Sequence, residues 1–154
     1  MLAEGQPAPD FTLNDQDCHP VTLSTLKGSV VVLYFYPKDA TPGCTTEACD
    51  FRDSHAVLKT LGVRVLGISP DDVTSHRKFA DKQELNFTLL ADPERTAIRA
   101  YDVWKEKNMY GKKSMGVERT TYVIDKTGTI RKIFPKVKVD GHVGKVVETV
   151  KGLA

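Results

Sequence analysis

A run of apolar and aromatic residues, Val30–Tyr36, limits the possible folds of this chain more than any other segment. The run is too short to cross a membrane as a helix, which needs about 20 apolar residues. Its residues are β-branched, aromatic or apolar throughout, which is the pattern of a central strand covered on both faces. Val63–Ile68 is a second segment of the same kind. Two such strands with a helix between them predict a βαβ unit and an α/β fold.

Helix and strand patterns alternate along the rest of the chain. Residues 44, 48, 51, 55 and 58 are Cys, Ala, Phe, His and Leu, which places them on one face of a helix expected over residues 44–59. The tetrapeptide Ser69–Asp72 predicts a helix start, with Ser69 as the cap, for a helix ending near Lys82. The remaining expected elements are a strand at Phe87–Leu90, a helix opened by Asp92–Glu94 with Ile98, Tyr101 and Trp104 facing inward, a hairpin of Thr120–Ile124 and Thr129–Phe134, and a last helix that buries Val143, Val146, Val147 and Val150.

The N-terminal residues predict a short hairpin, because Phe11–Leu13 and Val21–Leu23 flank a polar turn. No linker, repeat or low-complexity stretch divides the chain, so we expect a single domain over residues 1–154. The order of elements is that of a thioredoxin-like α/β fold, with a mixed central β-sheet flanked by helices and an N-terminal β-hairpin extension. Periodicity alone leaves another three-layer α/β arrangement open.

Composition argues against nucleic-acid and membrane partners. The 22 basic and 20 acidic residues give a net charge of +2 and are interleaved along the chain. The one basic cluster, at positions 105, 107, 112 and 113, is interrupted by Glu106 and is typical of a solvated loop. The N-terminus has neither a basic region nor an apolar secretion segment, so we expect a cytoplasmic protein. Three cysteines in a cytoplasmic chain favour a catalytic or incidental role over a disulfide framework.

Cys44 has the position of a nucleophile. It follows the strand Val30–Tyr36 and the loop Lys38–Gly43, at the start of the expected helix. Sites in open α/β sheets lie beyond the carboxyl ends of the strands. Free N–H groups and the positive end of the helix dipole favour a thiolate there, and the thiolate is the reactive form. A buried structural cysteine is the alternative, and position alone does not decide between the two.

The residues around Cys44 carry a resemblance to a known family. Pro37, Thr41 and Cys44 match the pattern Pro-x-x-x-Thr-x-x-Cys and resemble the peroxiredoxins. The longer text YPKDATPGCTTEACDFRD is similar to the bacterioferritin-comigratory-protein, or PrxQ, branch of these AhpC/TSA-type proteins. Further matches cover nearly the whole chain, at Ala8–Phe11, Leu66–Ser69, Asn86–Leu90 and Arg119.

The resemblance implies a role for each matched residue. Cys44 would be the peroxidatic cysteine, which attacks the peroxide O–O bond as a thiolate and becomes a sulfenic acid. Thr41 would hydrogen-bond the thiolate and the bound peroxide, and Arg119 would stabilise the thiolate and the developing charge. Pro37 would shield the pocket from water, and the backbone N–H groups of Gly43 and Cys44 would add donors. Without the resemblance, Arg119 would be interpreted as an exposed ion-pair residue, Thr41 as a turn hydroxyl and Pro37 as a strand terminator.

Cys49 is the candidate resolving cysteine, because the resemblance is to the branch that carries this thiol in the same helix as the peroxidatic one. Residues five apart on a regular helix have Cα atoms roughly 8–9 Å apart, beyond the limit of about 7 Å for a disulfide. A Cys44–Cys49 disulfide therefore requires the first turns of the helix to unwind. The alternative is that Cys49 only packs, and that an external thiol resolves the sulfenic acid.

The resemblance also implies the substrates and partners. The substrates would be hydrogen peroxide and organic hydroperoxides, and the reductant would be thioredoxin or glutaredoxin. No haem, flavin or metal cofactor is expected. Because Cys44 and Cys49 lie in one chain, the cycle does not require a dimer, and a monomer is expected.

The spacing of the cysteines bears on three functions other than that of a peroxidase. A thioredoxin-like disulfide reductase would carry Cys-x-x-Cys, and a copper chaperone on this fold Cys-x-x-x-Cys with a downstream histidine, whereas this chain has Cys-x₄-Cys. A redox sensor or chaperone stays open and could coexist with peroxidase activity.

The adjacent pair Cys18-His19 makes a poor metal chelate, so metal binding there is not favoured. His55 falls on the inner stripe of its helix and is expected to be a core histidine.

Overall fold

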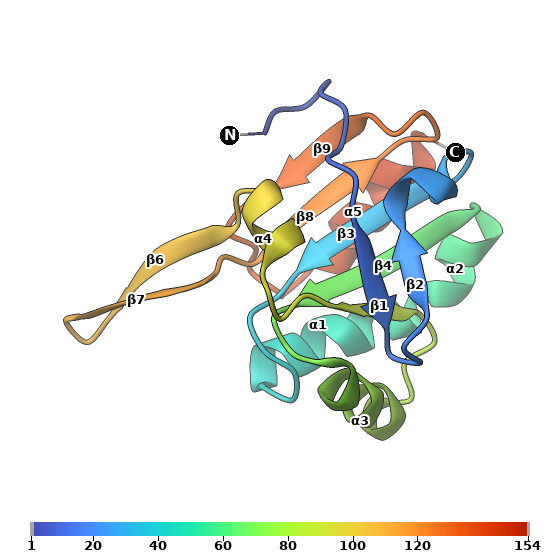
Figure 1. Ribbon diagram of the computed structural model, residues 1–154. Coiled ribbons are helices and arrows are strands. Elements are labelled where there is room, and N and C mark those ends of the chain that lie inside the picture. Colours follow the sequence, from blue (N-terminus) through green and yellow to red (C-terminus); the bar gives the residue numbers. More distant parts are fainter. Residues whose placement is uncertain (1, 154) are drawn as a thin grey trace.

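The computed structural model describes residues 2–153, except for the side chain of Met109. Its largest element is a 7-stranded sheet with the order β2-β1-β5-β4-β3-β8-β9 (Figure 1). The expected central strand is β3 (Val30–Phe35), and all its residues are buried. It pairs in parallel with β4 (Val63–Ser69) and antiparallel with β8 (Thr120–Ile124), and β5 (Thr88–Ala91) continues the parallel set. The predicted mixed central sheet is confirmed.

Both predicted hairpins are present at the edges of this sheet. At one edge, β1 (Thr12–Asp15) pairs antiparallel with β2 (Pro20–Thr22), and a 3-10 turn at Leu23–Leu26 leads on to β3. At the other edge, β9 (Ile130–Phe134) pairs antiparallel with β8. The N-terminal hairpin joins the sheet because β1 also pairs with β5.

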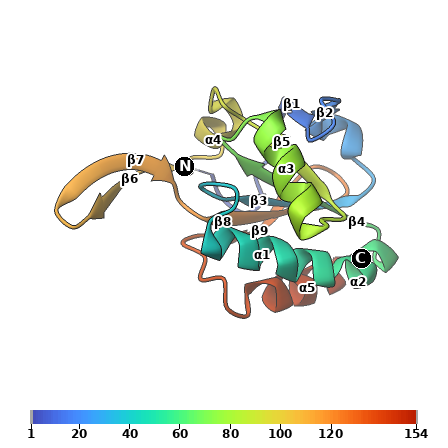
Figure 2. The ribbon, with the colours of Figure 1, turned by 90° about the horizontal axis from the view of Figure 1, so that it is seen from below.

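The helices are distributed unequally over the two faces of the sheet. Residues from α1 (Pro42–Asp53), α2 (His55–Thr60), α3 (Val73–Gln83) and α5 (His142–Lys151) pack into one core with the face of β3 that carries Tyr34. The short helix α4 (Thr96–Ala100) packs on the opposite face. Figure 2 shows α1 and α5 side by side beneath the sheet and α4 on its other side. No helix within residues 2–153 combines the length and apolar character needed to cross a membrane.

The single helix expected over residues 44–59 is two helices, so this prediction was wrong in its extent. Helix α1 begins at Pro42 and ends at Asp53, and α2 begins at His55. Ser54 interrupts them with φ −93° and ψ 0°. Serine competes for local backbone hydrogen bonds and is a weak helix former, which favours a break there. The break leaves His55 only half-buried, so the expectation of a core histidine was also wrong.

The predicted cap of the next helix was also wrong. Asp72, not Ser69, caps α3, and its carboxylate accepts a hydrogen bond of 2.8 Å from the N–H of Ser75. Ser69 instead ends β4 and donates its hydroxyl to Asp71. Both Ser and Asp are good caps, and the sequence motif did not show which of them is closest to the first helical turn.

The basic cluster forms a second, two-stranded sheet, which the sequence did not predict. Strands β6 (Trp104–Met109) and β7 (Lys112–Val117) pair antiparallel and project from the body of the protein (Figure 1). Trp104 therefore starts a strand and does not lie on the inner face of the preceding helix. Polar residues cover both faces of this hairpin, so its sequence lacks the alternation that identifies a half-buried strand.

Candidate active site

Cys44 lies in the first turn of α1, just beyond the carboxyl end of β3. Its side chain is 1% exposed, and the thiol is free. In the first turn of a helix, backbone N–H groups have no acceptor within the helix, so those of Gly43 and Cys44 can stabilise negative charge. The predicted position of Cys44 at a helix start is confirmed.

Arg119 contacts this sulfur directly. It precedes β8, and its Nη2 donates a hydrogen bond of 3.3 Å to the Sγ of Cys44. Its Nη1 donates at 2.7 Å to Oε1 of Glu47 on the next turn of α1. Burial opposes the charge of the guanidinium, but the negative charges of Glu47 and Cys44 raise the pKa of Arg119 above its ordinary value. A permanent positive charge is therefore held against the sulfur.

Glu47 is a site residue that the sequence reasoning missed. Its side chain is fully buried, and within residues 2–153 its Oε2 has no hydrogen-bond partner. Burial raises the pKa of Glu47 to about 7, although Arg119 acts in the opposite direction. The available signal was its spacing, since a residue three positions after Cys44 lies on the same face of the helix. Glu47 holds one nitrogen of the Arg119 guanidinium while the other contacts the sulfur.

Glu47→Gln is expected to remove part of the pH dependence of stability. Because the pKa of Glu47 in the folded protein is about 7, against 4.5 ordinarily, the folded protein holds a proton that the unfolded chain releases between these values. The free energy of unfolding contributed by this group therefore falls as the pH rises through that range. Urea unfolding measured from pH 4.5 to 8 should show a smaller fall in the free energy of unfolding for Glu47→Gln than for wild type.

Comparing wild type with Glu47→Gln isolates the contribution of Glu47 to the pH dependence of stability. Burial lowers the pKa of His142 to about 4, so stability contributed by His142 is lost as the pH falls below about 6.5. That opposite contribution is present in both proteins and cancels in their difference. An identical pH profile for wild type and Glu47→Gln would contradict the assignment.

Gly43 permits the close approach of Arg119 to the helix start. A Cβ atom at this position would lie 3.2 Å from Nη2 of Arg119, which is tighter than ordinary van der Waals contact. The residue before the nucleophile therefore has a steric role in the site. A larger side chain there would push the guanidinium away from the sulfur.

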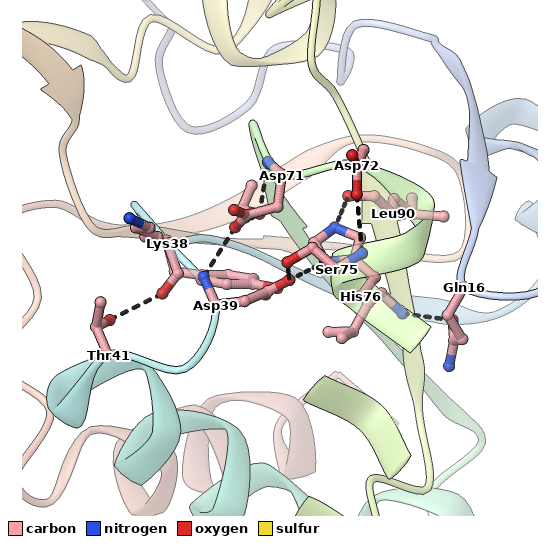
Figure 3. Close-up of polar contacts among 12 residues, drawn as sticks. Gln16, Lys38, Asp39, Thr41, Asp71, Asp72, Ser75, His76 and Leu90 are labelled. Carbon is pink, nitrogen blue, oxygen red and sulfur yellow. Dashed lines mark hydrogen bonds and ion pairs between the residues drawn. The ribbon is translucent and has the colours of Figure 1, made fainter. Parts of the chain in front are cut away.

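Thr41 and Pro37 lie beside the site, but their implied roles stay predictions. Thr41 occupies the N-cap position of α1, and its hydroxyl donates at 2.8 Å to the carbonyl of Lys38 (Figure 3). Among the hydrogen bonds of the described residues, none joins Thr41 to Cys44. Pro37 is half-buried and lies two residues after the end of β3. Because the Thr41 proton is directed to Lys38, its oxygen lone pairs stay available to accept a hydrogen bond.

The other two cysteines occupy different environments. Cys49 is half-buried on α1, and its Sγ donates to Oε1 of Gln83 at 3.5 Å. The helix is continuous between Cys44 and Cys49, and both thiols are free. Cys18 is exposed in the turn between β1 and β2, with φ 62°. Cys44 and Cys49 therefore share one helix, while Cys18 lies outside the site.

Lys107 adds a second cation that the sequence did not indicate. It lies on β6, where its side chain packs across Gly116 of β7. Burial, and then the positive charge of Arg119, lower the pKa of Lys107, while the negative charge of Cys44 acts in the opposite direction. Lys107, in the middle of β6, is therefore close enough to Cys44 for the two charges to affect each other.

Comparison with known proteins identifies the family. Residues 4–133 match the model of the AhpC/TSA family. Peroxiredoxin Bcp of Bacillus subtilis is 50% identical over 150 residues, which are 97% of this chain and 96% of that protein. The chain is a peroxiredoxin of the AhpC/TSA family. This peroxiredoxin also superimposes on a cysteine-to-serine mutant of PrxQ from Xylella fastidiosa, with a TM-score of 0.94, 35% identity and coverage of 99% and 97% of the two chains.

A second solved structure connects the fold to peroxide chemistry. The bacterioferritin comigratory protein of Xanthomonas campestris, studied for alkyl peroxide reduction, matches with a TM-score of 0.91 and 39% identity over 97% of this chain and 98% of its own. The resemblance, the thioredoxin-like fold and the enzyme class predicted from sequence are confirmed. This peroxiredoxin is a thiol-dependent peroxidase.

Proposed function

We propose that this peroxiredoxin reduces hydrogen peroxide and organic hydroperoxides through a sulfenic acid on Cys44, which Cys49 resolves as an intramolecular disulfide. This is an atypical 2-Cys mechanism. The main support is the contact of Arg119 with the Cys44 sulfur at the start of α1. A cation and free backbone donors around a nucleophilic sulfur favour attack on an electrophilic oxygen.

In the first step, the Cys44 thiolate attacks one oxygen of the peroxide. An S–O bond forms and the O–O bond breaks, so sulfur is oxidised by two electrons and the leaving oxygen is reduced. That oxygen takes up a proton and departs as water or an alcohol, leaving the sulfenic acid. Arg119 stabilises the negative charge that moves from sulfur to the leaving oxygen, with Thr41 as an acceptor for the peroxide proton and Pro37 limiting water access.

In the second step, the Cys49 thiolate attacks the Cys44 sulfur. An S–S bond forms, the S–O bond breaks, and the hydroxyl leaves as water after taking up a proton. On an intact α1 the two residues lie too far apart for this bond, because five helical positions separate them by roughly 8–9 Å between Cα atoms. Part of α1 must therefore unwind after oxidation of Cys44.

In the third step, a dithiol reduces the disulfide and returns the enzyme to its starting state. We propose a thioredoxin-type protein for this step, with glutaredoxin as the other candidate. The cycle uses no haem, flavin or metal, because sulfur carries all the electrons. We further propose that the enzyme acts in the cytoplasm as a monomer, since both reacting thiols lie on one helix of one chain.

Cys49→Ser is expected to separate the resolving step from the first step. Stoichiometric peroxide consumption should persist, while turnover with thioredoxin should fall at least about tenfold, because no intramolecular disulfide can form. A sulfenic-acid probe should label the variant at Cys44 after one equivalent of peroxide. The matched control is Cys18→Ser, which removes the exposed cysteine and should leave turnover unchanged. Full thioredoxin-dependent turnover in Cys49→Ser would refute the resolving role.

A further inference from the structure

Helix α3 contacts the chain on both sides of the segment that carries Cys44 and Cys49. On the upstream side it binds the loop between β3 and α1, through Asp39. On the downstream side it binds the end of α1, through Arg52. We call these contacts the upstream anchor (Tyr36, Asp39, Asp71, Ser75 and His76) and the downstream anchor (Phe51, Arg52, Gln83 and Asn86).

The upstream anchor is a buried hydrogen-bond network around Asp39 (Figure 3). The Asp39 side chain is 4% exposed, and it accepts from the hydroxyls of Tyr36 at 2.6 Å and Ser75 at 2.8 Å. Its other neighbour is Nδ1 of His76, at 2.7 Å. The backbone N–H of Asp39 donates to Asp71 at 2.8 Å. Removing one partner from such a network leaves buried polar groups unpaired, which makes it costly to open.

His76 connects this network to the sheet. Its side chain is 0% exposed, and Nε2 lies 2.9 Å from the carbonyl of Leu90 on β5. Since a carbonyl only accepts, Nε2 must carry a hydrogen. The contact between Nδ1 and Asp39 then needs one further proton between the two atoms, since otherwise both would be acceptors. The ring thus ties the loop before Cys44 to two fixed elements, α3 and β5.

The downstream anchor fixes the last turn of α1. Nη1 of Arg52 donates at 2.7 Å to the carbonyl of Gln83, the last residue of α3. The side chain of Asn86 donates at 3.2 Å to the carbonyl of Arg52. One position earlier, Phe51 is fully buried, and its ring stacks on Tyr34 with centroids 4.7 Å apart.

The segment between the anchors combines backbone strain with the burial of Cys44 and Ala48. Ala40 begins it with φ 61°, a left-handed conformation that is unfavourable for alanine. The hydroxyls of Thr41 and Thr46 bond only to carbonyls three and four positions earlier. Its side-chain hydrogen bonds to other elements are those of Cys44 and Glu47 with Arg119 and that of Cys49 with Gln83. Oxidation of Cys44 changes the buried sulfur that Arg119 contacts.

We propose that α3 holds both ends of the segment 40–50, so that unwinding of α1 is confined to this segment while the upstream and downstream anchors stay closed. His76 and Arg52 would then be positioning residues for the resolving step. This inference rests on the proposed Cys44–Cys49 disulfide for its role in the cycle. The anchors also keep the ends of the segment in place, so that it can refold once the disulfide is reduced.

Hydrogen exchange, measured by mass spectrometry on overlapping peptides, tests the boundaries. Each amide in α1 donates to the carbonyl four positions earlier, so opening of the segment 40–50 frees the amides of residues 45–54, including that of Ser54, which donates to Asp50. In the reduced protein these amides should exchange at least about tenfold faster than those of residues 58–61, which bond to carbonyls beyond the segment. In the peroxide-oxidised protein, residues 45–54 should lose protection, while the Asp39 amide and residues 58–61 keep it. Loss of protection at residues 58–61 together with 45–54 would overturn the inference.

Variants test each anchor separately. His76→Gln should extend the unprotected region of the oxidised protein upstream through Asp39, and Arg52→Gln should extend it downstream through residues 58–61, each by about a tenfold rise in exchange rate. Lys78→Gln, an exposed position on α3, is the control and should move neither boundary. If His76→Gln does not fold, Ser75→Ala removes a single donor to the same carboxylate. Variants of His76 or Arg52 that fold but keep the wild-type boundaries of exchange protection would overturn the proposal.

Peptide mapping of the same oxidised samples distinguishes the two proposals. Absence of a Cys44–Cys49 disulfide would refute the resolving step. The exchange boundaries of the reduced protein would still decide whether the anchors confine the opening of α1. A disulfide together with wrong boundaries would refute the anchors alone.

Discussion

Cys44→Ser is expected to lose peroxidase activity by a factor on the order of 10³ or more, because serine supplies no thiolate at neutral pH. Its oxygen could occupy the place of the sulfur beside Arg119, so the fold should be retained. The measurement is peroxide consumption under two conditions, with thioredoxin and as a single turnover without it. Both should vanish, since the first step itself is lost.

The controls for this variant are the other two cysteines. Cys18→Ser should keep both activities, and Cys49→Ser should keep only the single turnover. Stoichiometric reduction of peroxide by Cys44→Ser would contradict the assignment of the nucleophile. Thermal unfolding of each variant near the wild-type temperature would exclude loss of the fold as the cause.

Arg119→Met is expected to slow the reaction of Cys44 with peroxide by about 10²–10³-fold, the range seen when a preorganised donor to developing charge is removed. Arg119 makes two contacts at once, to the Cys44 sulfur at 3.3 Å and to Glu47 at 2.7 Å. Lysine lacks the planar fork that spans both partners, so Arg119→Lys should recover only part of the rate. Stopped-flow measurement of the oxidation step gives the rate constant directly.

The double variant separates the two contacts of Arg119. In Arg119→Met the buried Glu47 loses its cation, so the protein should be destabilised as the pH rises through the range in which Glu47 ionises. Adding Glu47→Gln should restore stability and leave the oxidation rate low. Recovery of the rate in the double variant would show that Arg119 acts only by neutralising Glu47. Arg131→Met, on the exposed side of β9, is the matched control and should change neither quantity.

The central part of the fold was predictable because its pattern is simple. The buried strands β3 and β4 are continuous apolar runs, and the position of Cys44 follows from a strand, a loop and a helix in sequence. The match of Thr41, Cys44 and Arg119 to the peroxiredoxins then indicated which residues form the site. The structure places Arg119 against Cys44, two residues 75 positions apart, and local periodicity cannot give such a contact.

What the sequence did not reveal is mainly buried and polar. Glu47, Asp39 and His76 are buried, yet these residue types are usually exposed, so hydropathy places them on the surface. Their partners come from distant elements, and no local pattern identifies them. The β6–β7 hairpin was not predicted because it projects from the body of the protein, so neither of its faces has to be apolar.

The most direct test of the proposed cycle is mass spectrometry after one equivalent of hydrogen peroxide, with free thiols alkylated and the peptides mapped. A disulfide between Cys44 and Cys49 is expected, with Cys18 alkylated. Oxidation of Cys44 to sulfenic or sulfinic acid with Cys49 alkylated would keep the peroxidase and refute the resolving step. Alkylated Cys44 in a sample whose peroxide has been consumed would contradict the assignment of Cys44 as the nucleophile.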